Sequence, residues 1–436
     1  QTHTLNNGLT LMMERLPHLR STAIGLFVKA GSIMEEEAHN GLSHFIEHMA
    51  FKGTTTRSAR QIADEIDLIG GNVNAATSKM STSYYARTTD KELPNALTLL
   101  ADMLVNPSFS AADMEKERQV ILEEIAMESD DPQDLVYNLS HQGMFADQTL
   151  SRSILGSAGA IKAYSLDDLT RFRQQFYRPG NTVLSVAGRF DPQQLILWAE
   201  EAFASWQGDM RAPSPRNQVV PGNNLLTLDK EVEQVHLCLT YEGLPSLDED
   251  RHALTVVSTA FGGGVSSRLF QKVREDQGLV YNIFSAPSFY PDCGELTIYA
   301  ACTPGKVHKV LDTIRREAAL MAEKGLTRQE FERTMAQLRT GFVLGMESAY
   351  QRMASMGMNM LLHQRVIEPR ETLALLRKVN LKTANRVARQ VLGATPKLAL
   401  VGKNISKRFK QEGQHGRRDL EGDALRVGRR RRPSGP

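Results

Sequence analysis

The chain has 436 residues, of which 41% are hydrophobic and 23% are charged, which is typical of a soluble globular protein with two to four domains. No apolar run approaches the roughly 20 residues that a membrane-spanning helix needs, so we expect no membrane span. The net charge is +2 and basic residues are not interleaved with aromatic ones, which gives no support to nucleic-acid binding.

The first residues and the cysteines give information on the cellular compartment of the protein. The opening QTHTLNNGLTLMME does not resemble a signal peptide, although a chain that opens on Gln leaves room for a leader removed earlier. Cys238, Cys293 and Cys302 lie in strand-like surroundings without paired spacing, so we interpret them as buried small side chains. These features favour a cytoplasmic protein, with a periplasmic or organellar location left open.

The first half of the chain mixes strand and helix patterns. In chain order these are a strand at 24–30, helices at 41–51 and 58–69, alternating strand-like residues at 72–88, helices at 91–105 and 111–129, and an apolar strand at 182–188.

The stretch GLSHFIEHMAFKG at 41–53 carries the strongest chemical pattern. His44, Glu47 and His48 share one stripe of the predicted helix, with Glu47 adjacent to both histidines. Two imidazoles one turn apart can bind a single zinc ion, and the carboxylate between them can hold and deprotonate water. The alternative is a solvated polar face, because this stripe lies opposite an apolar stripe made of Leu42, Phe45, Ile46, Met49 and Ala50.

A zinc site for catalysis usually has three protein ligands, so a third ligand is expected. Residues 110–132 predict a long acidic helix, on which Glu117, Glu124 and Glu128 share a stripe and Glu123 lies about 100° away. Helix periodicity alone does not choose among these acids, and acidic helix faces are usually just solvated.

The interval 206–224 is rich in Pro, Gly and Asn, and we interpret it as a linker between two halves. The glycines at 262–264 indicate a helix stop and not a phosphate loop, because no Gly-Lys-Ser/Thr follows. The second half repeats the outline of the first, which favours a duplicated α+β unit. In chain order it predicts a strand at 235–241, helices at 249–261 and 266–276, strands at 279–286 and 294–302, helices at 305–323 and 327–345, and a strand at 398–401.

The tail from Lys407 onward is strongly basic. It carries ten Lys and Arg against four Asp and Glu, a net charge of +6, which leaves −4 on the rest of the chain. With few large apolar residues it is interpreted as a solvated, disordered terminus and not as an adaptor for nucleic acid or membranes.

Several of these stretches together resemble one known family. The order H-x-x-E-H at 44–48 inverts the common zincin motif and marks inverzincins. With SHFIEHMAFKGT, the later ERQVILEEI and GGGVSSRLFQKVREDQGLVY in the second half, the chain closely resembles the M16 family of pitrilysin, insulin-degrading enzyme and the mitochondrial processing peptidase β subunit. The resemblance covers essentially residues 1–405, and the length matches the short two-domain bacterial subfamily.

The resemblance implies roles that the pattern left open. In the family the third zinc ligand is a Glu 76 residues after the second His, here Glu124, and Glu117 matches a supporting Glu seven positions earlier. Arg274 and Tyr281 match an Arg and a Tyr brought over the zinc from the C-terminal domain, where they could bind substrate and stabilise an oxyanion. Without the family, a surface Arg and a packed Tyr would be the simpler interpretation.

The residues NVNAATS at 72–78, after a Gly-Gly turn, indicate an edge strand. In the family such a strand pairs with extended substrate by β-augmentation, in which main-chain bonds grip a peptide with little demand on its sequence. Asn74 and Ala75 are the candidate substrate-binding residues.

The resemblance therefore implies an α+β fold of two homologous domains, each a mainly antiparallel sheet packed with several helices, which enclose a chamber. The predicted divisions are a zinc-binding catalytic domain at 1–205, a linker at 206–224, a homologous domain at 225–406 and a tail at 407–436. The expected activity is that of a zinc metalloendopeptidase acting on unfolded or presequence-like peptides, with one Zn²⁺ per chain held by His44, His48 and Glu124. Glu47 is expected to take a proton from the attacking water and later to donate one to the leaving amine.

A homodimer is the expected assembly, or a hetero-oligomer with another M16 subunit. Two alternatives stand beside this expectation: a processing-peptidase subunit that needs a partner, and an inactive structural homologue. The full set of zinc residues argues against the second alternative, and Arg274 and Tyr281 argue more weakly against the first.

Overall fold

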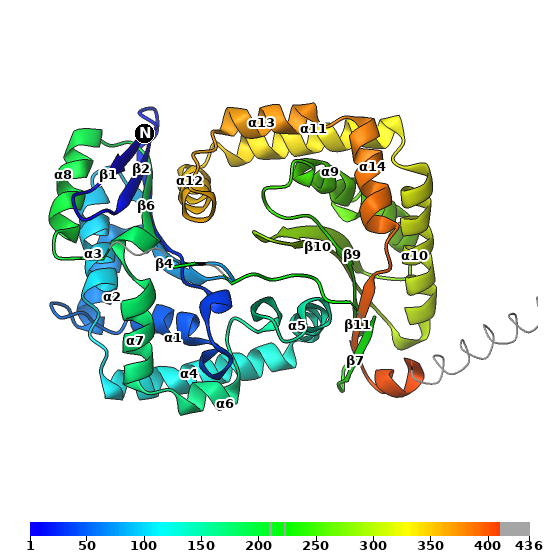
Figure 1. The fold of residues 1–436 in the computed structure, drawn as a ribbon, viewed down its shortest axis with the longest axis horizontal. Helices are drawn as coiled ribbons and strands as arrows, with labels where there is room; N and C mark the ends of the chain where they lie inside the picture. Colours follow the sequence, from blue (N-terminus) through cyan, green and yellow to red (C-terminus); the bar gives the residue numbers. More distant parts are fainter. Residues whose placement is uncertain (209–211, 214, 222–223, 410–436) are drawn as a thin grey trace, which may run out of the picture.

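The computed structural model describes residues 1–208, 212–213, 215–221 and 224–409, and it contains one β-sheet in each half of the chain, with helices around both (Figure 1). Part of the predicted linker and the basic tail from residue 410 lie outside the described residues.

The first sheet has six strands, and all neighbours pair antiparallel except β2 and β6, which run parallel. In side-by-side order they are β1 (Thr2–Thr4), β2 (Thr10–Arg15), β6 (Thr182–Gly188), β3 (Ser21–Val28), β5 (Thr82–Thr89) and β4 (Asn72–Thr77). Every residue of β6 is buried, as expected for an apolar run in the middle of a sheet that is covered on both faces.

The second sheet has five strands and repeats the topology of the first without a counterpart of β1, with its one parallel pair, β7 and β11, at the same place. In side-by-side order its strands are β7 (Leu225–Asp229), β11 (Lys397–Gly402), β8 (Val235–Glu242), β10 (Gly294–Cys302) and β9 (Asn282–Phe289). The order β7-β11-β8-β10-β9 corresponds to β2-β6-β3-β5-β4, which confirms the predicted α+β fold of two similar, mainly antiparallel sheets.

The helices also fall into two comparable sets. Those of the first half are α1 (Leu42–Met49), α2 (Ala59–Ile69), α3 (Leu93–Val105), α4 (Ala111–Asp130), α5 (Pro132–Phe145), α6 (Ala158–Ala163), α7 (Leu166–Phe176) and α8 (Pro192–Phe203). Those of the second half are α9 (Arg251–Gly262), α10 (Val307–Lys324), α11 (Arg328–Gly345), α12 (Ala349–His363), α13 (Pro369–Lys378) and α14 (Leu381–Leu392), with a π-helical turn, η5, at Phe270–Glu275. Short 3₁₀ turns occur at Ser32–Met34, Glu37–His39, Thr149–Ser151, Pro179–Asn181 and Pro304–Lys306.

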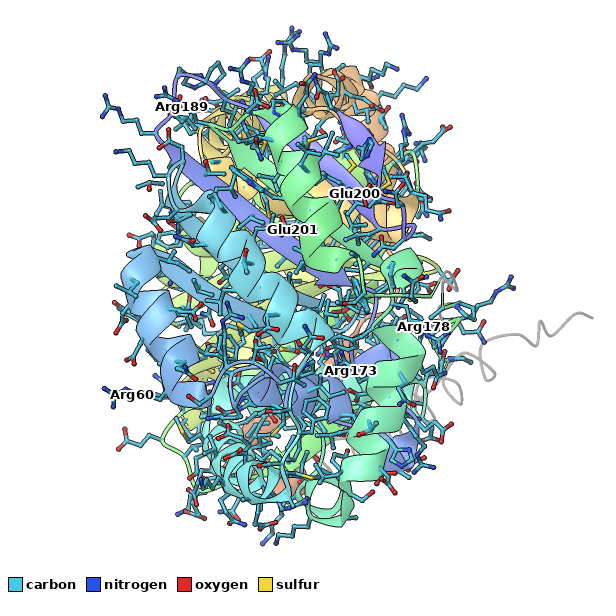
Figure 2. The ribbon with its side chains drawn as sticks, turned by 90° about the vertical axis from the view of Figure 1, so that its left-hand side faces the viewer. Arg60, Arg173, Arg178, Arg189, Glu200 and Glu201 are labelled. Carbon is cyan, nitrogen blue, oxygen red and sulfur yellow. The ribbon has the colours of Figure 1, made fainter. Side chains whose placement is uncertain are left out.

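The outer face of the first sheet is covered by α3 and α8, which Figure 2 shows face on. Glu200 of α8 accepts a hydrogen bond from the backbone N–H of Asn6 at 3.0 Å, which ties α8 to the N-terminal strands. Arg173 of α7 donates to the carbonyl of Leu104 at the end of α3, at 2.9 Å. These contacts fix the helical layer on the outside of the first half.

Each half contributes one helix to the sheet of the other half (Figure 1). The helix α5 packs on β8 and β11 of the second sheet, and α12 packs on the equivalent strands β3 and β6 of the first. Ser140 of α5 lies 2.6 Å from Thr240 of β8, hydroxyl to hydroxyl, and Ser185 of β6 donates to the carbonyl of Met353 at 2.8 Å. The exchange is therefore reciprocal, and it joins the two halves through their sheet faces.

Three local features differ from the sequence prediction or refine it. The alternating stretch at 72–88 is a hairpin of two strands, β4 and β5, and β4 is the edge strand. The predicted helix at 266–276 ends in the π-helical turn, and the next strand begins at Asn282, three residues later than expected. The reason is that Gly278 is left-handed, with φ +56°, and the backbone N–H of Leu279 still bonds back to Val273. The glycine stop after α9 is confirmed, since α9 ends at Gly262.

The three cysteines are buried and free, as expected. Within the described ranges, none of the helices combines the length and the apolarity that crossing a membrane requires.

Candidate metal centre

The helix α1 has the two faces that its sequence predicts. Leu42, Phe45, Ile46 and Met49 are each at most 2% exposed, because they recur every three or four residues on the side that packs into the first core. On the opposite stripe His44 and Glu47 line a cavity of about 610 Å³ beside α4, and His48 is half-buried. The polar stripe is therefore not a freely solvated surface.

His44, His48 and Glu124 form a compact group of potential metal ligands. The Nε2 atoms of His44 and His48 lie 3.6 Å and 3.5 Å from Oε2 of Glu124, and the ligand atoms of all three residues lie within 4.8 Å of one another. The two imidazole rings meet edge to face, with centroids 4.6 Å apart. Two nitrogens and one oxygen at such separations can share a single ion, which leaves a fourth tetrahedral position open.

The protonation of His44 also suits a metal ligand. Its Nδ1 is buried and has no hydrogen-bond partner among the described residues. Burial, with a smaller contribution from the charge of His48, lowers the pKa of His44 to about 4. The ring is therefore neutral near pH 7, which is the form that binds zinc.

Glu117 supports His48 from the far side of the ring. Oε2 of Glu117 lies 3.1 Å from Nδ1 of His48, and Oε1 accepts from the ammonium group of Lys52 at 2.6 Å. A carboxylate on the second nitrogen of a ligating His fixes its tautomer and ring orientation. Glu117 lies two turns before Glu124 on α4, so one helix supplies both acids.

Glu47 belongs to the site without being one of the grouped ligands. Its Oε2 accepts a hydrogen bond from the hydroxyl of Thr77 on β4, at 2.5 Å. Burial raises the pKa of Glu47, and the hydrogen bond from Thr77 offsets part of that rise. A carboxylate with a raised pKa beside a metal group is suited to accepting a proton from water.

The other acids of α4 make different contacts. Glu128 lines the same cavity and accepts hydrogen bonds from the hydroxyl of Ser153, at 3.2 Å and 3.4 Å. Glu123 has no place in the ligand group formed by the described residues. Among the four acids that the helix pattern left open, Glu124 is the one that joins both histidines in the ligand group of the described residues.

Both ends of α1 are tied to buried carboxylates. Gly41 stands at the N-cap and offers no capping side chain, so the carboxylate of Glu35 accepts from the backbone N–H groups of Gly41 and Ser43, each at 2.7 Å. Burial raises the pKa of Glu35, and these backbone hydrogen bonds offset part of the rise. Glu35 thus performs the capping that Ser, Thr, Asp or Asn usually performs at this position.

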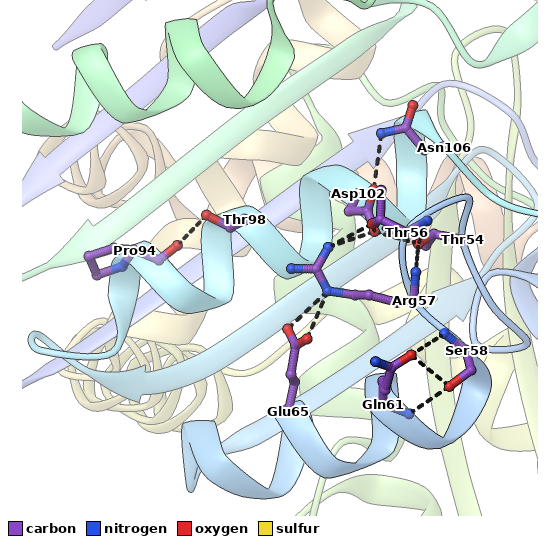
Figure 3. Close-up of polar contacts among 10 residues, drawn as sticks. All are labelled: Thr54, Thr56, Arg57, Ser58, Gln61, Glu65, Pro94, Thr98, Asp102 and Asn106. Atoms are coloured by element: carbon purple, nitrogen blue, oxygen red, sulfur yellow. Dashed lines mark hydrogen bonds and ion pairs between the residues drawn. The ribbon is translucent and has the colours of Figure 1, made fainter.

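The loop after α1 is held by Asp102 of α3 (Figure 3). Asp102 accepts from the hydroxyls of Thr54 at 2.5 Å and Thr56 at 2.9 Å, and from Arg57 at 2.7 Å. Burial alone would raise the pKa of Asp102, but its hydrogen bonds, including one from Asn106, lower it overall. The helix α1 is therefore fixed at its exit as well as at its start.

The predicted substrate strand lies beside this helix. Asn74 and Ala75 belong to β4, which is an edge strand of the first sheet. Asn74 is exposed, whereas Ala75 is buried and its backbone N–H bonds to the side chain of Asn74 at 2.9 Å. Ala76 and Thr77, at the end of the same strand, line the metal cavity.

Arg274 and Tyr281 pair with each other in the second half. The guanidinium of Arg274 lies 5.0 Å from the centre of the Tyr281 ring and 4.6 Å from that of Phe270. Tyr281 is 80% exposed, and no contact between described residues joins either side chain to the metal group. The structure thus brings together His44, Glu47, His48, Glu117 and Glu124, but not this pair.

Sequence reasoning missed Thr77, Glu35 and Lys52. Thr77 was detectable in principle, since residues 73, 75 and 77 alternate onto the inner face of β4. Glu35 and Lys52 make contacts that no short periodicity encodes.

Comparisons with known proteins agree with this geometry. Residues 10–158 match the family model described as insulinase (peptidase family M16), and residues 163–338 match the one described as peptidase M16 inactive domain. An uncharacterised zinc protease of Streptomyces coelicolor is 39% identical over 92% of this chain and 88% of its own length. The uncharacterised zinc protease YmxG of Bacillus subtilis is 38% identical over 92% of this chain and 97% of its own length.

Solved structures show the same fold. The crystal structure of a protease from Helicobacter pylori superposes with a TM-score of 0.86 at 21% identity, covering 92% of this chain and 99% of that one. A peptidase M16 inactive domain from Pseudomonas fluorescens gives a TM-score of 0.85 at 19% identity, with 92% and 97% coverage. On the family models and the close relatives together, the chain belongs to the M16 peptidase family.

Proposed function

We propose that the protein is a zinc-dependent metalloendopeptidase that hydrolyses peptide bonds in unfolded peptides or presequence-like segments. The observation that carries the proposal is the convergence of His44, His48 and Glu124 beside Glu47, a half-buried carboxylate outside the ligand group. A purely structural member of the family would need neither the ligand group nor the adjacent base. The word "inactive" in one family description applies to a match at 163–338, whereas this group lies before residue 158.

Each side chain has a chemical task in this proposal. Zinc, held by His44, His48 and Glu124, would supply a Lewis acid that polarises the scissile carbonyl and acidifies water. Glu47 accepts the proton of the attacking water and returns it to the leaving amine. Glu117 keeps the His48 ring in the tautomer that leaves Nε2 free for the metal.

The peptide is proposed to bind as an added strand along β4. Main-chain hydrogen bonds from an edge strand grip an extended peptide, which an unfolded segment can supply and a folded domain cannot. Asn74 and Ala75 are the proposed contacts, and Ala76 and Thr77 lead the strand into the cavity. The cavity also has acidic side chains beyond the metal group, which favours substrates with basic residues; they are Glu128, Asp131 and Asp134.

Arg274 and Tyr281 are proposed to contact the substrate after the second half moves toward the metal group. The exposure of Tyr281 supports this, because an exposed phenol with no contact to the first half is free to engage a ligand. A second candidate function follows from the same observation: a processing-peptidase subunit whose site is completed by a partner chain. A homodimer is compatible with both candidate functions.

We also propose a cytoplasmic location. Its support is the set of three free, buried cysteines, which a reducing compartment maintains.

The test is cleavage of an unstructured peptide by the purified chain alone. We expect one zinc per chain by elemental analysis, cleavage that stops with a chelator, and recovery when zinc is returned. Glu47→Gln should retain zinc but lose about 10²- to 10⁴-fold in kcat, which is the contribution of a positioned general base.

A matched control is Glu123→Gln, on the same helix as Glu124 but outside the ligand group, which should leave kcat unchanged. Cleavage that persists in the chelated protein or in Glu47→Gln would refute the zinc mechanism. A zinc-loaded chain that is inactive alone but cleaves when a second M16 subunit is added would establish the partner-dependent function instead.

A further inference from the structure

The general base and the substrate strand meet at one hydroxyl group. Thr77 is the last residue of β4, and its Oγ1 donates to Oε2 of Glu47 at 2.5 Å. Hydrogen bonds to a charged acceptor are about twice as strong as neutral ones, and this one is short. The backbone N–H of Thr77 makes a second, smaller contribution to the same carboxylate, so both polar groups that hold Glu47 come from this residue.

Hydrogen bonds hold the turn that follows Thr77, and they fix the position of the Thr77 hydroxyl. Residues 78–81 close the hairpin: the backbone N–H of Ser78 bonds to the carbonyl of Ser81 at 2.8 Å, and the hydroxyl of Ser78 accepts from Ser81 N–H at 3.1 Å. The backbone N–H of Ile33 bonds to the carbonyl of Lys79 at 3.0 Å. Met80 is buried in a cluster that includes Cys293 from the second half.

A second hydroxyl stands behind the first. Oγ1 of Thr82, opposite Thr77 in the hairpin, lies 3.3 Å from Oγ1 of Thr77 and donates to the carbonyl of Ala30 at 2.7 Å. Because the proton of Thr82 is committed to Ala30, Thr82 can accept from Thr77 but not donate to it. Thr77 can therefore donate to Glu47, or accept from it and donate to Thr82 instead.

We infer that Thr77 is a positioning residue that holds the Glu47 carboxylate in its orientation for proton transfer, and that it links this orientation to the strand on which the peptide docks. The inference rests on the proposed function for its catalytic meaning. Ala76 lies next to Thr77 in β4. A peptide that pairs with β4 therefore binds beside the residue that holds Glu47. The Thr77 hydroxyl bonds to Glu47 and to none of the three residues of the ligand group, so its effect is on the base and not on metal binding.

The test compares two substitutions that differ in the hydroxyl. Thr77→Val keeps the size and branching but removes the hydroxyl, and Thr77→Ser keeps the hydroxyl. In the zinc-loaded full chain we expect Thr77→Val to lower kcat about 10- to 100-fold with KM changed less than threefold, the effect of losing one charge-assisted hydrogen bond. Thr77→Ser should restore kcat to within about threefold of the wild type.

Two further readouts separate positioning from general damage. Zinc content and thermal unfolding should match the wild type in both variants, and Ser83→Ala, which removes another hydroxyl of the same hairpin, should leave kcat unchanged. Thr77→Val added to Glu47→Gln should cost nothing more, because the group it positions is already lost.

A measurement that does not depend on enzymatic activity tests the inference separately from the proposed function. In crystal structures of the metal-free variants, the Glu47 carboxylate should leave its wild-type position in Thr77→Val and keep it in Thr77→Ser. An unmoved carboxylate, or full activity in Thr77→Val, overturns the inference. If the wild type proves not to cleave peptides, the proposed function fails, and the crystal comparison alone still decides whether Thr77 holds Glu47.

Discussion

At the scale of single residues, the centre depends on two acids of α4 that look alike in the sequence. Glu117 and Glu124 are seven residues apart and so face the same way, but one contacts Nδ1 of His48 and the other lies near Nε2. The two nitrogens of the His48 ring thus each face an acid of the same helix, α4. The assignment of Glu124 as a zinc ligand stays a prediction that metal analysis can test.

The lowered pKa of His44 predicts how the metal-free protein responds to acid. An unfolded His titrates near 6.5, whereas folded His44 titrates at about 4, so between these values the unfolded chain binds a proton that the folded chain does not. The free energy of unfolding should therefore fall as pH drops from about 6.5 to 4, by about 3 kcal/mol from this group, with no contribution above that window. Urea unfolding of the chelated protein at several pH values measures it.

The control for this prediction is His44→Gln, which has no ring to protonate. Its unfolding free energy should lose about 3 kcal/mol less than that of the wild type over the same pH range. Equal pH dependence in the two proteins would show that His44 is not held neutral by the fold.

At the scale of elements, local pattern predicted most of the layout. The 3.6-residue period placed α1, and runs of apolar residues placed β6 and β10 at or within a residue of their observed ends. The repeated outline predicted two equivalent sheets, because each half carries the same succession of local signals. The predicted α+β fold is confirmed on this basis.

The sequence pattern missed several elements altogether and did not reveal long-range packing. The missed elements are β1, β2, β7, α5, α6, α7, α8, α12, α13 and α14. An amphipathic face shows that a helix is packed on one side, but it does not show against which element. The patterns of α5 and α12 therefore do not reveal that each packs on the sheet of the other half. The same holds for Glu35, whose hydrogen bonds reach forward across a 3₁₀ turn to α1. Within the site, the two histidines followed from spacing and Glu124 from the family resemblance, whereas the support from Thr77 depends on how β4 lies against α1.

The start of α1 gives a prediction for the element as a whole. Glu35→Ala leaves the backbone N–H groups of Gly41 and Ser43 buried without their acceptor, at about 1–3 kcal/mol for each unsatisfied group. We expect a loss of about 2–4 kcal/mol in unfolding free energy and weaker zinc binding, because both histidines lie within two turns of this end. Chemical denaturation and a zinc competition assay measure the two effects.

A neighbouring acid provides the comparison. The side chain of Glu36 is 86% exposed, so Glu36→Ala should stay within about 0.5 kcal/mol of the wild type. An equally small change in unfolding free energy for Glu35→Ala would show that capping by Glu35 does not stabilise α1.

At the scale of the whole molecule, the exchange of α5 and α12 ties the metal group to the half that carries Arg274 and Tyr281. His141 of α5 lies 2.9 Å from Glu295 of β10, and Arg352 of α12 pairs with Glu14 of β2. Lys397 of β11 donates to the carbonyl of Gly143 on α5 at 2.6 Å. Any approach of Tyr281 to the metal group has to occur with these two helices in place.

The exchange also predicts how a separated first half behaves. The division at residues 205 and 225 stays a prediction, and a fragment of residues 1–205 is its direct test. The fragment keeps the core between the first sheet and its own helices, but it loses α12 from the other sheet face. The exposed residues of that face would form one apolar patch, made of Met12, Leu16, Ala23, Phe27, Val183 and Ala187.

We therefore expect the isolated fragment to bind a hydrophobic dye such as ANS, to self-associate in analytical ultracentrifugation, and to unfold at lower urea than the full chain. Residues 225–406 added in trans should suppress dye binding and give a one-to-one complex, because they return Met353 and Leu361 of α12 to the patch. A matched 225–406 fragment with Met353→Asp, a charge at a fully buried position, should fail to do so. A monomeric 1–205 fragment that binds no dye would show that α12 is dispensable to the first half, and that the halves are joined by their linker more than by their exchanged helices.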